Sequence, residues 1–331
     1  MNICVYGAGA VGGNVAARLA ATFPGDISVV ARGAHLQAIR ERGVILRTPT
    51  DEIVGRPVIA TDNPAELPPQ DLIVVGLKAH SLGSEAERIA RLRKPDVPVL
   101  FLTNGIPWWW SHGLGNSASK SGTLELLDAN QKLWNVLGSD AVLGGVVYSP
   151  NEVSEPGVIT NHGPTRFVIG EPSGVSTPRL AATIAAFKAA GLNPEVAADI
   201  RRVIWKKLLL NASGNPISAL TRLTGRQRAE TPGLPDLVRK VMSEVLDVAA
   251  SLGWDLRQDE DVQAILQSGG PSTSRDNRSS MLQDTLAGRR LEVDALLGQV
   301  QAFARQQNVA TPTLDVVLPL LRGLDKSIAA E

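Results

Sequence analysis

One stretch of the chain carries a row of polar side chains in otherwise apolar sequence. Lys207, Asn211 and Asn215 recur every four residues, so in a helix they share one face. Residues 201–216 are predicted to form this helix, bent or ended near Pro216. An ammonium and two amides on one face suit the protonation and orientation of a carbonyl compound. The row is either a solvated stripe or the wall of a site, and the two asparagines favour the site.

A second motif with chemical meaning lies at the start of the chain. A short apolar run, 2–6, is followed by the turn Gly7-Ala8-Gly9-Ala10-Val11-Gly12 and then by helical spacing over 13–20. Strand, G-x-G-x-x-G and helix in this order form the dinucleotide-binding fingerprint. The first glycine permits the tight turn, the second lets the backbone approach a pyrophosphate, and the third lets the helix pack closely. All six turn residues are therefore predicted to contact a dinucleotide; the alternative is a glycine-rich turn without a ligand.

The choice of dinucleotide is expected to depend on the end of the second strand. The run 27–30 leads to Arg32, which lies 20 residues after Gly12, and no Asp or Glu occupies this point. An acidic residue there would bind the ribose 2′-hydroxyl of NAD, whereas an arginine accommodates the 2′-phosphate of NADP. Arg32 thus indicates NADP(H), unless it is an ordinary solvated arginine.

Two further polar residues follow apolar runs typical of buried parallel strands. Lys78 comes after the run 71–77, and Asn104 with Gly105 comes shortly after the run 97–102. Ligands of doubly wound sheets bind at the carboxyl ends of the strands. Both residues are therefore expected near a bound cofactor.

Trp108, Trp109 and Trp110 follow the second of these strands. Three adjacent side chains cannot all face one side of a regular element. The segment is predicted to be either a surface loop with partly buried aromatic rings or a lid or pocket wall.

The remaining pattern divides the chain into two parts. Up to about residue 198, strands alternate with helices, and from residue 200 onward the apolar spacing is almost entirely helical. The predicted fold is α/β: a Rossmann-type dinucleotide-binding domain, residues 1–198, and an all-α substrate and catalytic domain, residues 199–331. Further strands are expected at 44–46, 58–60, 141–148, 157–160 and 166–170, and further helices near 84–92, 178–190, 233–252, 258–267, 275–287, 290–307 and 312–322.

Composition limits the class of protein. Lys and Arg together number 33, as do Asp and Glu, so the charge gives no reason to expect nucleic acid or a membrane as partner. The single cysteine, Cys4, excludes an intramolecular disulfide, and the chain has no metal-spaced His/Cys/Asp cluster. A soluble cytoplasmic protein acting on a small molecule is expected, and a homodimer is compatible with this interpretation.

Several separated motifs together resemble the ketopantoate reductase family. They are the glycine turn, Leu77-Lys78-Ala79, Asn104-Gly105, Trp205-Lys206-Lys207-Leu208 with Asn211 and Asn215-Pro216, Ser279-Ser280-Met281-Leu282-Gln283-Asp284, and Glu292-x-Asp294. The resemblance covers nearly the whole chain. It implies an N-terminal Rossmann domain, a C-terminal helical domain, and a site between them.

The resemblance also implies a role for each matching residue. Lys207 corresponds to the catalytic lysine that protonates the carbonyl oxygen, and Glu292 to the acid that orients it. The implied substrate-binding residues are Asn104, Asn211, Asn215 and Ser280, and Lys78, Asn104 and Glu292 are implied beside the cofactor. Alternatively, Ser280 is an ordinary helix-start serine, and Glu292 is a surface acid beside Arg289 and Arg290. Lys206 competes with Lys207, and only the family motif selects Lys207.

The function implied by the resemblance is NADPH-dependent reduction of 2-dehydropantoate to (R)-pantoate, a step of pantothenate and coenzyme A biosynthesis. Two departures from the family pattern leave the substrate open. The stretch between Gly105 and Val142 is longer than usual and contains the tryptophans, and Leu297-Gly298 stands where the family often has Asn-Gly. The alternatives are a related reductase of a bulkier 2-oxo acid and a non-catalytic NADP(H)-sensing protein.

Overall fold

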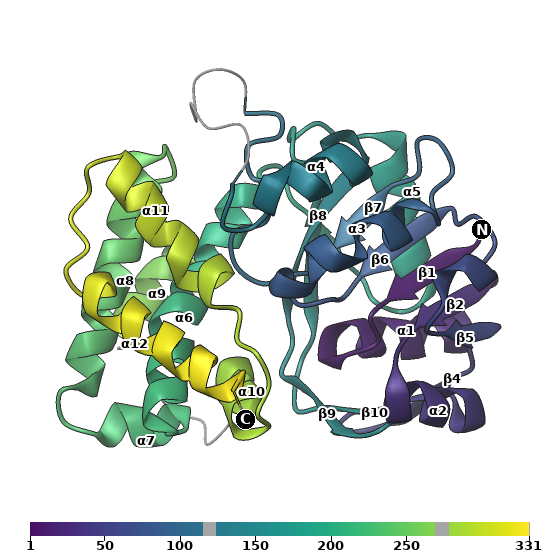
Figure 1. The fold of residues 1–331 in the computed structure, drawn as a ribbon, viewed down its shortest axis with the longest axis horizontal. Coiled ribbons are helices and arrows are strands. Elements are labelled where there is room, and N and C mark those ends of the chain that lie inside the picture. The colour runs from purple at the N-terminus through teal and green to yellow at the C-terminus, as the bar shows by residue number, and fades with distance from the viewer. Residues whose placement is uncertain (115–123, 269–277, 331) are drawn as a thin grey trace. The chain divides into compact units, whose positions relative to one another are not determined.

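The structure is a computed structural model that describes residues 1–114, 124–268 and 278–330. The chain forms two compact units. Of the described residues, the first unit comprises 1–103, 108–114 and 124–203, and the second comprises 104–107, 204–268 and 278–330. Each unit is described separately, and Figure 1 gives the labels of their elements.

The first unit is built on an eight-stranded sheet with the order β12-β11-β8-β7-β6-β1-β2-β5 (Figure 1). All neighbouring strands pair in parallel except β11 and β8, which are antiparallel. The strands are β1 Ile3–Tyr6, β2 Ile27–Val30, β5 Ile59–Thr61, β6 Leu72–Val75, β7 Val99–Phe101, β8 Val142–Tyr148, β11 Arg166–Gly170 and β12 Glu195–Val196. The near-continuous apolar runs of β1, β2, β6 and β7 are fully buried, as expected for parallel strands.

The register of the central strands determines which loops meet. Tyr6, the last residue of β1, pairs with Val30 of β2 and with Val75 of β6. The three strands therefore end at the same level, and the segments that follow them share one edge of the sheet. The sequence predicted these strands, but only their pairing brings the glycine turn beside Arg32.

A second sheet of four strands, in the order β4-β3-β10-β9, was only partly predicted. Its strands are β3 Val44–Arg47, β4 Glu52–Gly55, β9 Asn151–Glu155 and β10 Val158–Asn161. Strands β4 and β9 were not predicted from the sequence because both are short, partly exposed and contain glutamate. The two-residue strand β12 was not predicted either.

The helix α1, Ala10–Thr22, packs against strands of both sheets. A Cβ atom at Gly55 would lie 2.3 Å from the Ala17 carbonyl oxygen, and one at Gly13 would lie 2.6 Å from the Ile159 side chain. The small sheet can therefore approach α1 only where glycines replace side chains. Because both faces are covered in this way, the direction of α1 is fixed relative to the glycine turn at its start.

Four further α-helices lie wholly within the described residues of the first unit: α2 Gly33–Arg42, α3 Leu82–Ala90, α4 Lys132–Leu137 and α5 Pro178–Ala189. Of these, α3 and α5 lie close to the ranges predicted from the sequence. Thr177 caps α5 by accepting a hydrogen bond from Leu180, and Pro178 occupies the first turn. Neither α2 nor α4 was predicted from the sequence.

The three tryptophans are buried in the core of the first unit. Trp108, Trp109 and Trp110 are each about 1% exposed, so the prediction of a surface loop with partly buried rings is wrong. Trp108 packs edge-on against Phe101, and the six-membered ring of Trp109 lies where a side chain at Gly144 would have to stand. All three rings become buried because the segment turns through the core instead of continuing as a strand.

Arg201 explains how this segment is held. Its buried guanidinium lies 5.8 and 5.7 Å from the ring centroids of Trp109 and Trp110. It also donates hydrogen bonds to the carbonyl oxygens of Trp110, at 2.7 Å, and of Pro172 and His112. Burial lowers the pKa of Arg201 to about 10, which still leaves it charged at neutral pH.

The second unit consists of helices among its described residues (Figure 1). They are α6 Ile200–Thr221, which begins in the first unit, α7 Gly225–Glu230, α8 Leu234–Ser251, α9 Glu260–Gln267, α10 Ser280–Leu286, a π-helical turn Asp294–Gly298, α11 Gln299–Gln306 and α12 Leu314–Ile328. The helix α6 runs through Pro216 instead of ending there. Part of the predicted helix 275–287 lies outside the described residues.

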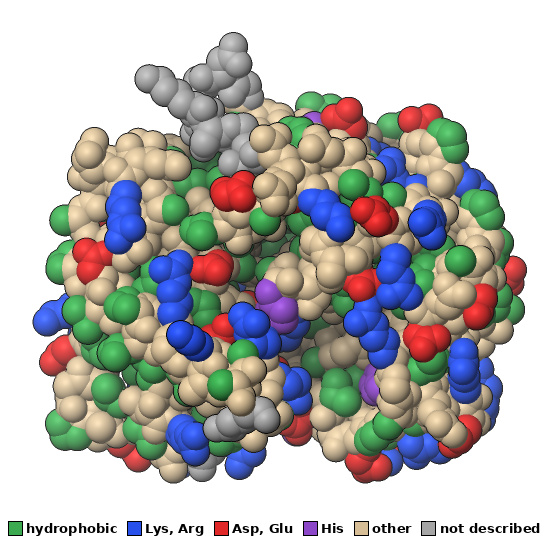
Figure 2. All heavy atoms as spheres, in the orientation of Figure 1, with side chains coloured by type: hydrophobic (Ala, Val, Ile, Leu, Met, Phe, Trp, Pro, Cys, Tyr) green, Lys and Arg blue, Asp and Glu red, His purple; other side chains and the backbone are tan. Residues whose placement is uncertain are grey.

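The surface carries both signs of charge. Figure 2 shows basic and acidic side chains interspersed on the visible face, in keeping with the equal numbers of each in the sequence. Among the described residues, no helix combines the length and apolar character needed to cross a membrane. The same part of the chain holds no group of three or more His, Cys, Asp or Glu side chains placed to bind a metal ion.

Candidate functional site

The glycine turn of the first unit has the geometry of a dinucleotide site. Gly7 has a φ of +94°, which favours glycine, and a Cβ at Gly12 would lie 2.0 Å from the Gly7 carbonyl oxygen. Gly9 is different, because apart from its neighbours along the chain no described atom lies within 4 Å of the place where its Cβ would stand. The protein itself thus gives no packing reason for a glycine at this position. The close approach of a ligand to the backbone does give one.

The start of α1 is also suited to a phosphate. Gly9 is the N-cap residue and provides no side-chain hydrogen bond, and the first turn contains no acidic residue. The N–H groups of the first helical turn of α1 and the positive end of its dipole therefore point toward the glycine turn. Together with the open side of Gly9, these features fit a bound pyrophosphate.

His35 supports the glycine turn, a role that the sequence did not predict. Its Nδ1 accepts a hydrogen bond from the Gly157 amide at 2.9 Å, so the proton of the neutral ring is on Nε2. Nε2 lies 2.7 Å from the Ala8 carbonyl oxygen and donates to it. His35 therefore links the turn to the small sheet through a contact between residues far apart in sequence.

Arg32 lies at the end of β2, as predicted, but it is not an isolated solvated arginine. Its guanidinium forms a hydrogen-bonded ion pair with Glu85 of α3, while 64% of the arginine side chain stays exposed. The Tyr6 hydroxyl donates to the other Glu85 oxygen at 2.5 Å, and Arg88 lies 3.3 Å from the same oxygen. An acidic residue is thus present beside Arg32. It comes from α3, so the sequence next to Arg32 gives no sign of it.

These partners determine the charge state of Glu85. Burial by itself raises the pKa of this carboxyl group. The hydrogen bonds from Tyr6 and Arg32 and the charges of Arg32 and Arg88 outweigh burial, and the net pKa is lowered. Glu85 is therefore an anion at neutral pH, and it holds Arg32 at the edge of the sheet where the glycine turn lies.

The other predicted residue of the first unit, Lys78, follows β6. It is half-buried and precedes a short 3₁₀ turn, Ala79–Ser81. It therefore lies at the carboxyl edge of the sheet, as expected from its position after a buried strand.

In the second unit, three of the predicted site residues meet. The Lys207 ammonium donates to Asn104 Oδ1 at 2.7 Å. Asn104 Nδ2 lies 3.4 Å from Glu292 Oε2, at the long end of the hydrogen-bond range. The amide oxygen faces the cation and the amide nitrogen faces the anion, which is the orientation that satisfies both.

The burial of Glu292 excludes the alternative that this residue is a surface acid. Glu292 is about 5% exposed and is not a surface acid, although Arg289 and Arg290 beside it in sequence are exposed. Arg289 pairs with Asp284 and Arg290 with Asp325, so other carboxylates neutralise the two arginines. The Glu292 carboxylate faces the Asn104 amide.

Asn104 is positioned by a close backbone contact. Gly105 has a φ of +80°, and a Cβ on it would lie 2.3 Å from the Ala295 carbonyl oxygen. The Ile106 amide donates to the same oxygen at 2.8 Å. Ala295 belongs to the π-helical turn that follows Glu292, so this contact fixes Asn104 and Glu292 relative to each other.

The polar row on α6 continues beyond Lys207. Asn211 and Asn215 are half-buried, whereas the neighbouring Ala212 and Ser213 are fully buried. Lys206 lies elsewhere and pairs with Asp259 at 2.7 Å and Asp261 at 2.9 Å. The two adjacent lysines thus have different partners: Lys207 contacts Asn104, and Lys206 contacts two carboxylates.

Ser280 is exposed at the first position of α10, and the preceding Ser279 caps the helix by accepting from the Leu282 amide. Ser279 is therefore the N-cap, and Ser280 is the first residue of the helix, so its position also fits the alternative of an ordinary helix-start serine.

A sheet with a glycine turn, followed by a helical unit with a lysine, an amide and a buried carboxylate in contact, defines the class of dinucleotide-binding oxidoreductases. The comparisons give the family. The model described as ketopantoate reductase PanE/ApbA matches residues 3–174, and its C-terminal counterpart matches residues 199–325. The chain belongs to the ketopantoate reductase family, and the predicted α/β fold with an all-α C-terminal part is confirmed.

Individual relatives agree with this assignment. A 2-dehydropantoate 2-reductase of Mesorhizobium japonicum is 40% identical over 326 residues, which cover 98% of both chains. The crystal structure of a putative ketopantoate reductase from Ralstonia solanacearum is 34% identical, has a TM-score of 0.89, and is matched over 99% of this chain and 98% of its own. A D-mandelate dehydrogenase complex with NADH and anilino(oxo)acetate shares the fold at 21% identity and a TM-score of 0.81, with 99% and 100% of the two chains covered.

Proposed function

We propose that this member of the family catalyses the NADPH-dependent reduction of 2-dehydropantoate to (R)-pantoate, a step of pantothenate biosynthesis. The observation that carries the proposal is the contact of Lys207 with Asn104, with the buried Glu292 on the other side of the same amide. A carbonyl reductase needs a positioned proton donor, and Lys207 is a cation held in one direction. The 40% identity to a 2-dehydropantoate 2-reductase supports the substrate.

The choice of NADPH over NADH rests on Arg32. The glycine turn and the start of α1 would hold the pyrophosphate, and the exposed guanidinium of Arg32 would pair with the 2′-phosphate. When bound, NADPH supplies the hydride. Glu85 keeps Arg32 in place and leaves part of the guanidinium exposed for a second anion.

Lys207 would perform the proton chemistry. Negative charge develops on the keto oxygen during reduction, and a hydrogen bond from the ammonium stabilises it before the proton is transferred. Asn104 fixes the direction of the ammonium, and Glu292 fixes the orientation of Asn104. Asn211, Asn215 and Ser280 would hold the substrate carboxylate and hydroxyl, and Lys78 would lie beside the cofactor.

The tryptophans no longer favour a bulkier substrate. That alternative depended on a lid or pocket wall made of Trp108, Trp109 and Trp110, and all three rings are covered by the core of their own unit. The non-catalytic alternative predicts cofactor binding without a proton donor, whereas a lysine with an ordered amide partner is present.

One assay tests the proposal. NADPH oxidation is followed by absorbance with 2-dehydropantoate and a panel of other 2-oxo acids, including aromatic ones, and each is repeated with NADH. We expect the highest kcat/KM for 2-dehydropantoate with NADPH. A higher value for an aromatic 2-oxo acid would reassign the substrate, and NADPH binding without turnover on any member would favour the sensing protein.

A further inference from the structure

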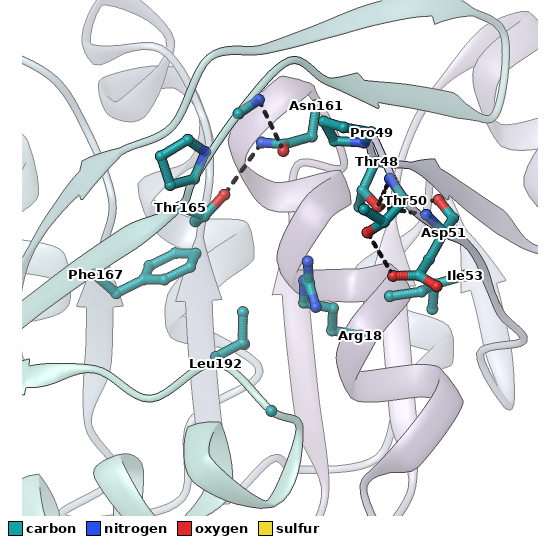
Figure 3. Close-up of a pocket in the computed structure, with 13 residues that line it drawn as sticks. Arg18, Thr48, Pro49, Thr50, Asp51, Ile53, Asn161, Thr165, Phe167 and Leu192 are labelled. Atoms are coloured by element: carbon teal, nitrogen blue, oxygen red, sulfur yellow. Dashed lines mark hydrogen bonds between the residues drawn. The ribbon is translucent and has the colours of Figure 1, made fainter.

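The first unit contains a hollow of about 400 Å³ to which the proposed reaction assigns no role (Figure 3). It is bounded by α1, by the turn between β3 and β4, by the segment from Asn161 to Phe167, and by the end of α5. On α1 the hollow is lined by Arg18, which comes nine residues after Gly9. The hollow is therefore separated from the glycine turn by roughly 13 Å along the helix axis. Its volume lies within the range of small-molecule pockets, about 300–1,000 Å³.

Arg18 supplies a cation to this hollow. Its Nε donates to Asn14 Oδ1 at 3.2 Å, and among the described residues Asn14 is the only hydrogen-bond partner of the side chain. Figure 3 shows the guanidinium standing in the hollow. Burial lowers the pKa of Arg18, and the charge of Asp51 partly offsets this effect. The guanidinium thus has lost part of its hydration, and its terminal nitrogens face the hollow.

Asp51 supplies a carboxylate on the facing side (Figure 3). Its backbone is fixed by the turn, in which Thr48 Oγ1 accepts from the Asp51 amide at 2.9 Å and donates to the Asp51 carbonyl oxygen at 3.1 Å. The Thr50 hydroxyl donates to Asp51 Oδ2 at 2.8 Å. The charge of Asp51 acts to raise the pKa of Arg18, yet in the described chain the two side chains form no ion pair within 4 Å.

The opposite wall is also fixed before any ligand binds. Asn161 is about 5% exposed, and its Nδ2 donates to Asn151 Oδ1 at 2.7 Å, to Ser149 Oγ at 3.0 Å and to Thr165 Oγ1 at 3.1 Å. Its Oδ1 accepts from the Gly163 amide at 3.3 Å. This network holds the Asn161–Thr165 segment in one conformation, and such preformed walls are usual in ligand sites.

Apolar side chains complete the lining. The ring of Phe167 is almost completely buried, Leu192 is 7% exposed, and Ile53 is half-buried. The hollow therefore combines one cation, one anion, several hydroxyl groups and an apolar side.

We propose that this hollow binds a small zwitterion, an α-amino acid with an apolar side chain. The ligand carboxylate would accept from Arg18, the ligand ammonium would donate to Asp51, and the side chain would contact Phe167 and Leu192. A simple anion fits less well because Asp51 would repel it, and a simple cation fits less well because Arg18 would. A zwitterion neutralises both groups at once.

Isothermal titration calorimetry with L-phenylalanine and L-leucine tests this inference, and two analogues of phenylalanine remove one charge each. N-acetyl-L-phenylalanine lacks the ammonium, and L-phenylalanine amide lacks the carboxylate. On the unmodified protein we expect both analogues to bind roughly tenfold more weakly or worse, because each loses a charge-assisted hydrogen bond. An analogue that binds as tightly as its parent amino acid would overturn the assignment.

Three variants locate the site. Arg18→Gln and Asp51→Asn should each weaken amino-acid binding by roughly tenfold or more, whereas Arg56→Gln, an exposed arginine outside the hollow, should not. NADPH binding and turnover should be unchanged in all three. Absence of any binding heat with either amino acid, or equal affinity in wild type and Arg18→Gln, would refute the proposal. Since the analogue experiment needs no variant, a poorly folded variant leaves the inference testable.

Discussion

The Lys207 ammonium lies 2.7 Å from the side-chain oxygen of Asn104, a residue 103 positions earlier in the chain. The amide nitrogen of Asn104 faces the buried Glu292. A cation and an anion thus bind the two ends of one amide, so that each limits the orientation of the others. The first two predictions follow from this arrangement.

Lys207→Ala should lower kcat by roughly 10²–10⁴, the usual range for a positioned general acid. NADPH affinity, measured by fluorescence titration, should change little, because the glycine turn and Arg32 are expected to bind the cofactor. Lys206→Ala is the matched control, since Lys206 pairs with Asp259 and Asp261 instead. If the Lys206 variant loses turnover while the Lys207 variant stays near wild type, the catalytic assignment is wrong.

Glu292→Ala should also lower kcat, because Asn104 and the ammonium would lose their fixed orientation. A double-mutant cycle with Lys207→Ala measures the coupling. The double variant should lose less activation free energy than the sum of the two single losses, as is usual for groups that act together. Strictly additive losses would show that Glu292 acts independently of the lysine.

Arg32→Ala should weaken NADPH binding by roughly 10–100-fold, the loss expected for a charge-assisted hydrogen bond, and leave NADH nearly unaffected. Direct titration with both cofactors measures this difference. Arg40→Ala serves as control, because that exposed arginine on α2 donates to the Ala60 carbonyl oxygen. Equal losses for NADPH and NADH would mean that Arg32 does not bind the 2′-phosphate.

Glu85 should make the stability of the protein depend on pH in acid. The pKa of its carboxyl group in the folded state is below the ordinary 4.5, so its charge stabilises the fold above that pH. This stabilisation is lost as the pH falls from about 4.5 through the folded-state pKa. The difference in free energy of unfolding between wild type and Glu85→Gln, from urea titrations, should therefore be largest near neutral pH and shrink below pH 4.5.

The control for that experiment lies on the same helix. Glu87 is largely exposed and lies 3.6 Å from Lys132. Glu87→Gln should leave the stability nearly unchanged at every pH, since exposed ion pairs contribute little. A Glu85 variant with the same pH profile as the Glu87 variant would contradict the role given to the Tyr6–Glu85–Arg32 cluster.

Trp109→Ala should destabilise the protein by about 3–5 kcal/mol, the usual cost of removing a buried aromatic side chain. The guanidinium of Arg201 would also lose a ring contact. Chemical denaturation measures the loss, and Trp254→Ala, at a half-buried position, should cost less. In the folded fraction, KM for 2-dehydropantoate should stay near wild type. A large KM change without loss of stability would restore the lid interpretation.

The sequence by itself determined the features that depend on local spacing. Buried strands are visible as continuous apolar runs, the glycine turn as a fixed pattern, and the polar row of α6 as a four-residue repeat, because short-range backbone geometry sets each of them. Strands β4 and β9 were not predicted because they lack such a local pattern. They are partly exposed and contain glutamate, and they form only because they pair with β3 and β10.

Tertiary structure decided what depends on contacts between distant residues. Sequence assigned Glu292 to the lysine only through a family motif, and the folded chain brings it to Asn104 across 188 positions. No local signal marks Glu85 as the partner of Arg32 or His35 as the support of Ala8, since each contact joins separate elements. The segment of the buried tryptophans is held by Arg201, 91 residues later than Trp110, which donates hydrogen bonds to carbonyl groups of that segment. Spacing along one element does not encode such pairings, because they arise only when the elements pack.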